Sequence, residues 1–372
     1  MKICLLSSEL SPLAKTGGLG DAVSGLARFL AAQGVDLRVF LPFYSVCKID
    51  PEVVAPVEFL QGLETELAGR AVEYGVYTTA LPGSSLPIYL IHCPPLYDRR
   101  GIYDDRGDEH LRFALFARAA IESCQRMGFG PDVFHLNDWH TALVPVYLRA
   151  LYGWDELFAG SRTLLTIHNL AYQGVFPARE VEALGLSSAT SMLHQEQLAA
   201  GHLNFMTSGI LHADHLSTVS RTYAREIQTP AHGFGLDGLL RSRADHLAGI
   251  VNGVDYGEWD PAADKLIAHP YSVSDLEGKE WNKKALLEEV GLPYESGVPV
   301  LGVVSRLTAQ KGFDLFFDAI PELLARRDAR LVVLGSGEAR YEEIFHRQQS
   351  TIPGRAHFHC GYSNPLAPKI QA

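Results

Sequence analysis

A lysine and a glycine-rich turn lie between the first expected strand and the first expected helix, in the run Lys15-Thr16-Gly17-Gly18-Leu19-Gly20-Asp21. Glycines allow a backbone to approach a ligand closely, and the N-terminus of a helix presents N–H groups to an anion. Lys15 adds a cation beside Gly17 and Gly18. The run is neither G-x-G-x-x-G nor a P-loop. We therefore predict an anion site here, with a purely structural turn as the alternative.

Polar side chains follow two further expected strands. His135, Asn137 and Asp138 stand at the end of the apolar run 132–136, and His168 and Asn169 follow the run 163–167. Ligands of open α/β sheets bind at the carboxyl ends of the strands, so these side chains are candidates for a ligand cleft. Asp138 could equally cap the next helix, and a single histidine is more often structural.

A second pair of cations stands in the run 305–312. Arg306 and Lys311 are five residues apart in a loop that leads from a strand into a helix. Two cations and a helix N-terminus can together hold a diphosphate. Gly335 opens a further glycine turn that could receive a nucleotide base or ribose. The alternatives are two solvated loop cations and a bare turn.

Motifs for metal or hydrolase chemistry are missing. The sequence holds no D-x-D, no H-E-x-x-H and no G-x-S-x-G. His357 and His359 alternate on one expected strand, but further metal ligands are lacking nearby. We therefore expect chemistry that needs neither a metal nor a cofactor.

The composition is that of a globular protein, with 47% hydrophobic and 20% charged residues. The formal net charge of −11 makes nucleic acid or an anionic membrane an unexpected partner. Five scattered cysteines give no disulfide framework. The N-terminal apolar run is too short for a signal peptide, and no run approaches a membrane span of about 18 residues. These features predict a cytoplasmic location.

Strand-like and helix-like segments alternate along the chain, which predicts an α/β fold with parallel sheets. We expect the first domain to span residues 1–245 and the second to span residues 246–372. After residue 298 only three strands are found, fewer than the roughly six of a doubly wound sheet, so the second domain is expected to be incomplete. The expected strands are 2–6, 37–41, 71–80, 86–91, 132–136, 163–167, 216–219, 247–251, 300–304, 330–334 and 356–359. The expected helices are 21–33, 109–127, 141–151, 189–213, 279–290, 312–326 and 339–349.

Six of these motifs occur in the order found in one enzyme family. Together they resemble bacterial glycogen synthase, a retaining glucosyltransferase similar to plastid starch synthases. The matching segments cover essentially the whole chain and are residues 15–19, 135–140, 166–177, 233–240, 251–255 and 305–312.

The resemblance implies the GT-B arrangement, in which two Rossmann-like doubly wound domains face each other across a cleft. It implies ADP-glucose as donor and glycogen or another α-1,4-glucan as acceptor. Donor phosphates and sugar would be held by Lys15, Gly17, Gly18, Arg306 and Lys311, with Gly335 and Asn252 also on the donor side. Asp138 and His168 would contact the transferred glucose, and Tyr97 and Asp98 would lie on the cleft wall.

This chain departs from the family pattern at two places. Ala231 and His232 replace the acidic residue that usually precedes the Gly-Phe-Gly-Leu loop, and the family continues beyond Ala372 with further donor-binding residues. A non-catalytic glucan-binding remnant is therefore an alternative to the synthase. A nicotinamide-dependent oxidoreductase would share the fold but lacks its dinucleotide fingerprint.

Overall fold

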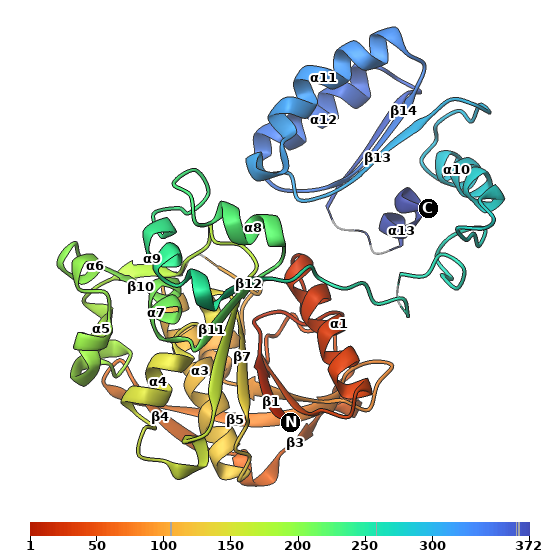
Figure 1. The fold of residues 1–372 in the computed structure, drawn as a ribbon. Coiled ribbons are helices and arrows are strands. Elements are labelled where there is room, and N and C mark those ends of the chain that lie inside the picture. Colours follow the sequence, from red (N-terminus) through yellow and green to blue (C-terminus); the bar gives the residue numbers. More distant parts are fainter. Residues whose placement is uncertain (105, 258, 362, 364) are drawn as a thin grey trace. The chain divides into compact units, whose positions relative to one another are not determined.

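The structure is a computed structural model that describes residues 1–104, 106–257, 259–361, 363 and 365–372. The chain divides into two compact units, Met1–Val254 and Asp255–Ala372, and each is described by itself (Figure 1). None of the helices in the described ranges is long and apolar enough to cross a membrane.

The first unit is built on one mixed sheet, which has ten strands among the described residues in the order β12-β11-β8-β7-β1-β2-β6-β5-β3, with β4 beside β5. The strands from β12 to β6 run parallel, and β3, β4 and β5 are antiparallel additions. The central strands are nearly continuous apolar runs, as expected for parallel strands that are covered on both faces. The strands are β1 (Lys2–Leu6), β2 (Asp36–Pro42), β3 (Ala55–Pro56), β4 (Leu63–Leu67), β5 (Arg70–Ala80), β6 (Pro87–His92), β7 (Val133–Asn137), β8 (Arg162–Ile167), β11 (His215–Thr218) and β12 (Leu247–Gly249).

Helices cover both faces of this sheet. The chain passes from β1 through α1 (Gly18–Ala32) to β2 in one direction, and from β7 through α4 (Val144–Ala150) to β8 in the other. Right-handed crossovers therefore put α1 and α4 on opposite faces. α3 (Glu109–Arg126) connects β6 to β7 and packs against α4. The remaining helices are α2 (Pro94–Tyr97), α5 (Glu180–Ala183), α6 (Gln195–Ala199), α7 (Phe205–His212), α8 (Arg221–Glu226) and α9 (Asp237–Ser242).

Two expectations about the first unit differ from the structure. The segment 189–213, expected as one helix, contains α6, the short strand β10 (His202–Asn204) and α7, because β10 pairs with β9 (Val175–Pro177). The expected domain boundary at residue 245 falls before β12. That strand pairs in register with β11, so the first unit runs on to Val254.

In its described residues the second unit is a three-layer α/β/α arrangement around three parallel strands in the order β13-β14-β15. Alternate side chains of β14 point to two separate cores, one containing Leu331 and Val333 and the other Val332 and Leu334. The first core is completed by α11 and α12 and the second by α10 and α13 (Figure 1). The elements are α10 (Glu277–Glu289), β13 (Val300–Val304), α11 (Phe313–Arg326), β14 (Arg330–Gly335), α12 (Ala339–Thr351), β15 (Ala356–Cys360) and α13 (Leu366–Gln371).

Candidate active site

The strand order of the first unit has a switch point between β1 and β7. From β1 the chain moves to β2 on one side, and from β7 it moves to β8 on the other. Open α/β sheets form their ligand crevice at such a point, outside the carboxyl ends of the strands. The glycine turn follows β1, Asp138 follows β7 and His168 follows β8, so all three groups of predicted residues stand at this edge.

Glu9 organises the loop that follows β1. Its side chain is buried, and Oε2 accepts hydrogen bonds from the backbone N–H groups of Thr16 at 2.7 Å and Gly17 at 3.1 Å. Oε1 accepts from the hydroxyls of Thr16 at 2.7 Å and Tyr103 at 2.9 Å. The N–H group of Gly17, which was expected to receive an external anion, is thus bound to Glu9. The N–H groups of the first turn of α1, which have no partners within the helix, remain for a ligand.

Lys15 is placed at the start of α1 by an ion pair. Its Nζ lies 2.6 Å from Oδ1 of Asp21 in the first helical turn, and both side chains are partly exposed. The ammonium therefore stands beside the helix N-terminus, where the N–H groups of the helix also favour an anion.

Gly17 and Gly18 border open space. A Cβ atom built on either residue meets no other atom within 4 Å, and Gly17 has an extended backbone with φ −157°. The fold itself therefore does not require glycine at these two positions.

Asp138 joins the ends of β7 and β8. Its Oδ1 accepts hydrogen bonds from the backbone N–H groups of His168 at 2.7 Å and Asn169 at 3.4 Å. Its backbone has φ +57°, an unusual conformation for aspartate, and its side chain caps no helix. The Asp138 side chain therefore does not cap the following helix, as the alternative had it.

His168 is held in one orientation by Asn137. The side-chain amide of Asn137 donates to the carbonyl oxygen of Leu6 at 2.9 Å, which leaves its Oδ1 as acceptor for Nε2 of His168 at 3.0 Å. This network assigns the proton of the neutral ring to Nε2. Nδ1 of His168 is then a hydrogen-bond acceptor.

Burial shifts the pKa values of these side chains toward their neutral forms. It raises the pKa of Asp138 to about 7, although the N–H groups of His168 and Asn169 act in the opposite direction. Burial lowers the pKa of His168 to about 4, and it lowers that of His135 to about 4. Near neutral pH both rings are uncharged, and the Asp138 carboxyl can exchange a proton.

Glu9 electrostatically links the glycine turn with the strand-end cluster. Its negative charge further raises the pKa of Asp138 and partly offsets the effect of burial on His168. Glu9 was not among the residues predicted from the sequence. The available signal was a carboxylate three residues beyond the first buried strand, at the same edge as Asp138.

Other predicted residues of the first unit are either buried in its core or exposed outside the cluster around Asp138 and His168. Tyr97 is fully buried and its hydroxyl donates to the carbonyl oxygen of Arg112, so the expectation that it lines a cleft is wrong. Asp98 is exposed at the end of α2. His140 packs in the core against Phe113. Asn252 is exposed in the segment that follows β12.

The second unit presents the two cations predicted to bind the donor on one loop. Arg306 and Lys311 are exposed, and Gly312, with φ +78°, leads directly into α11. Leu307 fixes this loop to the glycine turn after β14: its N–H donates to Ser336 at 2.9 Å, and its carbonyl oxygen accepts from Glu338 at 2.8 Å.

Gly335 allows this close contact between the two loops. A Cβ atom at Gly335 would lie 2.0 Å from the carbonyl oxygen of Ser305. Gly335 therefore has a packing role in the structure. Its expected contact with the donor stays a prediction. Among the described residues no three histidine, cysteine or acidic side chains gather as a metal site, and His357 and His359 are no exception.

Comparison with known proteins identifies relatives of both units. Residues 2–242 match the family model of the starch synthase catalytic domain, and residues 298–371 match that of glycosyl transferases group 1. Glycogen synthase 1 of Geobacter sulfurreducens is 41% identical over all of this chain, which covers 74% of that protein. Glycogen synthase of Anaeromyxobacter sp. (strain Fw109-5) is 43% identical over all of this chain, which covers 77% of it.

One solved structure of a starch synthase is similar to almost the whole chain. The catalytic domain of starch synthase IV from Arabidopsis thaliana, bound to ADP and acarbose, superposes with a TM-score of 0.91 at 30% sequence identity. The match covers 99% of this chain and 76% of that one.

Proposed function

Because the chain belongs to the family of bacterial glycogen synthases and starch synthases, we propose that it is a retaining glucosyltransferase. It moves glucose from ADP-glucose to the non-reducing end of an α-1,4-glucan such as glycogen. The structure of the Arabidopsis relative was solved with ADP and with acarbose, which supports a nucleotide donor and a glucan acceptor.

In this proposal the donor diphosphate is held by cations and backbone N–H groups. Lys15 and the first turn of α1 act from the first unit, and Arg306 and Lys311 act from the second. Negative charge grows on the diphosphate as the glycosidic bond breaks, and fixed cations stabilise that charge in the transition state. Gly17 and Gly18 leave room for the donor beside the backbone.

Asp138 and His168 act on the transferred glucose. Nδ1 of His168 accepts a hydrogen bond from a sugar hydroxyl, and the buried Asp138 stabilises positive charge at the anomeric carbon when its carboxyl is ionised. Asn252 contributes a polar group on the donor side.

Retention of configuration follows from attack on the face that the diphosphate leaves. The acceptor hydroxyl bonds to the anomeric carbon while the bond to the phosphate oxygen breaks. The proton of that hydroxyl moves to the departing phosphate, so no enzyme nucleophile is needed.

The observation that carries this proposal is the gathering of the glycine turn, Glu9, Asp138 and His168 at the switch point between β1 and β7. In a chain of this family, that edge contains the groups needed to bind a sugar and an anion side by side.

A transfer assay tests the proposal. Purified chain is incubated with glycogen and ADP-glucose labelled in the glucose, and label is counted in washed polymer. Incorporation that requires both chain and glycogen supports the synthase. Retention of the chain on glycogen without incorporation indicates a non-catalytic glucan-binding protein and contradicts the proposal. UDP-glucose in a parallel reaction tests the donor base, and we expect ADP-glucose to be preferred.

We further propose a cytoplasmic location. All five cysteines are free, as expected in a reducing compartment.

A further inference from the structure

A cavity lies at the amino end of the first unit's strands, at the opposite edge of the sheet from Asp138 and His168. Thr163 stands at the start of β8 and Asp214 immediately before β11, whereas His168 follows the end of β8. His168 is the fifth residue after Thr163, which is a separation of about 16 Å at the usual rise of a strand. The cavity is therefore distinct from the candidate active site.

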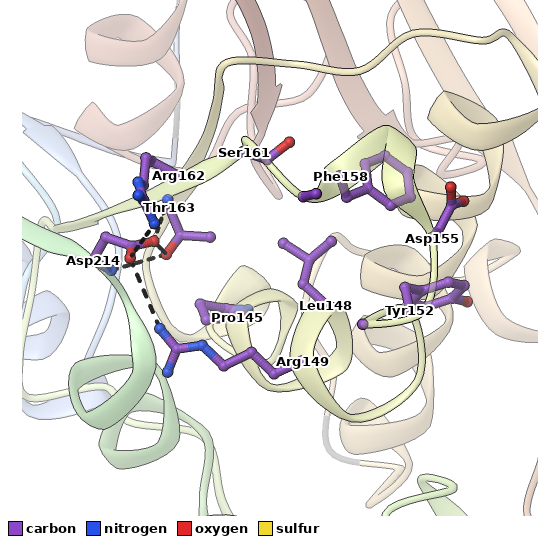
Figure 2. Close-up of a pocket in the computed structure, with 12 residues that line it drawn as sticks. Pro145, Leu148, Arg149, Tyr152, Asp155, Phe158, Ser161, Arg162, Thr163 and Asp214 are labelled. Carbon is purple, nitrogen blue, oxygen red and sulfur yellow. Dashed lines mark hydrogen bonds and ion pairs between the residues drawn. The ribbon is translucent and has the colours of Figure 1, made fainter.

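Two arginines face one carboxylate at one end of this cavity. Oδ1 of Asp214 lies 3.9 Å from Nη2 of Arg149 and 3.8 Å from Nη1 of Arg162. These contacts are longer than hydrogen bonds. Oδ2 of Asp214 accepts from the N–H and the hydroxyl of Thr163, both at 2.8 Å. Figure 2 shows both guanidinium groups directed at the single aspartate.

The charge of Asp214 is therefore shared between two cations and the strand backbone. Burial opposes its ionisation, but the hydrogen bonds of Thr163 and the charges of Arg149 and Arg162 outweigh burial and hold its pKa below the usual value. One negative charge faces two positive ones, so the cluster keeps an excess positive charge in a chain whose net charge is −11.

One neighbouring group orients Arg149 and another adds positive charge. His212 accepts a hydrogen bond from Nη1 of Arg149 on its Nδ1 at 3.0 Å and donates from Nε2 to the carbonyl oxygen of Met192. Burial lowers the pKa of His212, with smaller contributions from Arg149 and Arg243, so the ring stays neutral and orients Arg149. Arg243 binds the last carbonyl groups of α7, which places a third guanidinium close by.

The other end of the cavity is lined by Leu148 and Phe158 together with Tyr152 and Asp155, as Figure 2 shows, and the volume is about 200 Å³. The Asp155 carboxylate accepts hydrogen bonds from the N–H of Leu157 at 3.0 Å and the side-chain amide of Gln125 at 2.6 Å. Pockets for drug-sized ligands usually exceed about 300 Å³. The occupant must therefore be small, with an anionic group at the arginine end.

We propose that this cavity binds a phosphate monoester of a small sugar. Arg149 and Arg162 hold the phosphate, and the sugar lies toward Leu148 and Phe158. A phosphate monoester is close to a dianion at neutral pH and accepts paired hydrogen bonds from guanidinium groups, which suits two arginines better than a carboxylate does.

Calorimetric titration with glucose 1-phosphate tests this site. The whole chain is used with excess ADP present, so that phosphate groups do not report on the proposed donor site. We expect saturable binding that weakens at high salt. The double variant Arg149→Gln with Arg162→Gln should bind glucose 1-phosphate with an affinity lower by about tenfold or more. The control pair Arg179→Gln with Arg225→Gln removes two exposed arginines elsewhere in the unit and is expected to leave binding unchanged.

A second variant tests the sugar end of the cavity. Ala159 lines the cavity and is exposed, so Ala159→Trp should fill it while leaving the arginines in place. This variant should weaken binding of glucose 1-phosphate more than binding of inorganic phosphate. The absence of saturable binding, equal affinity for inorganic phosphate, or unchanged binding in the double arginine variant would overturn the proposal.

Discussion

Glu9 joins two loops that are far apart in the sequence. Its carboxylate accepts hydrogen bonds from Thr16, Gly17 and Tyr103, and its charge acts on Asp138 and His168. A buried carboxylate with four donors fixes the path of the loop that follows β1. Its effect on the site is therefore both mechanical and electrostatic.

Glu9→Gln should separate these effects. The amide oxygen can still accept both backbone N–H groups, but the NH2 group then replaces Oε1, the acceptor of the Thr16 and Tyr103 hydroxyls. The hydrogen bonds also lose their charge assistance, so the free energy of unfolding should fall by about 1–3 kcal/mol in denaturant titrations. Removal of the Glu9 charge should also lower the pKa of Asp138, followed by carboxyl NMR. Glu52→Gln, at an exposed site, is the control. Unchanged stability and an unchanged Asp138 pKa would contradict this role.

Asp138 should make stability depend on pH in a defined direction. Its pKa is about 7 in the folded chain and about 4 when unfolded, so the folded state binds more protons between these values. This carboxyl therefore lowers stability as pH rises through that range. Relative to the parent chain, Asp138→Asn should gain stability with rising pH, by at most about 1.4 kcal/mol per unit, and then level off above pH 7.

Urea unfolding of both chains across this pH range measures the difference. Asp245→Asn, which changes an exposed aspartate of the same unit, is the control. A difference between Asp138→Asn and the parent that does not vary with pH would show that the buried carboxyl titrates normally.

At the scale of elements, two kinds of glycine have opposite roles. Gly335 lets the turn after β14 contact the loop after β13, where a Cβ atom would meet backbone at 2.0 Å. Gly17 and Gly18 border open space and have no such neighbour. Packing therefore explains why residue 335 is glycine. Space for a ligand better explains the glycines at positions 17 and 18.

Alanine substitutions should distinguish the two roles. Gly335→Ala should destabilise the second unit by about 1–3 kcal/mol, because backbone must move to admit the methyl group. Gly17→Ala and Gly18→Ala should unfold like the parent chain but lower the rate of glucosyl transfer. Normal transfer by both of these variants would show that no donor approaches the turn.

The alternation of strands and helices was predictable because buried parallel strands are apolar runs bounded by turn residues. Strands 2–6 and 300–304 match β1 and β13, and most other bounds of the elements that were expected lie within two residues of those observed. The β9–β10 pair was not predictable, because three-residue strands carry too short a pattern within a segment of helical spacing. Asp138 and His168 were found from their place after strands, whereas Glu9 acts through a loop whose path only the structure gives.

At the scale of the whole molecule, an acidic chain must concentrate its cations where it binds phosphate. The net charge is −11, yet Lys15 stands at a helix N-terminus and Arg306 and Lys311 share one exposed loop. A surface of this overall sign repels a diphosphate, so local cations must dominate binding and their effect should weaken with salt.

The most direct test of the proposed glucosyl transfer is the turnover of Arg306→Gln with Lys311→Gln, measured with labelled ADP-glucose and glycogen. The control, Arg326→Gln with Arg347→Gln, removes two exposed cations from α11 and α12 of the same unit. Loss of two groups that stabilise the departing diphosphate should lower turnover by on the order of 10²-fold or more, with an unchanged unfolding midpoint. Turnover equal to that of the parent chain and the control would contradict the account.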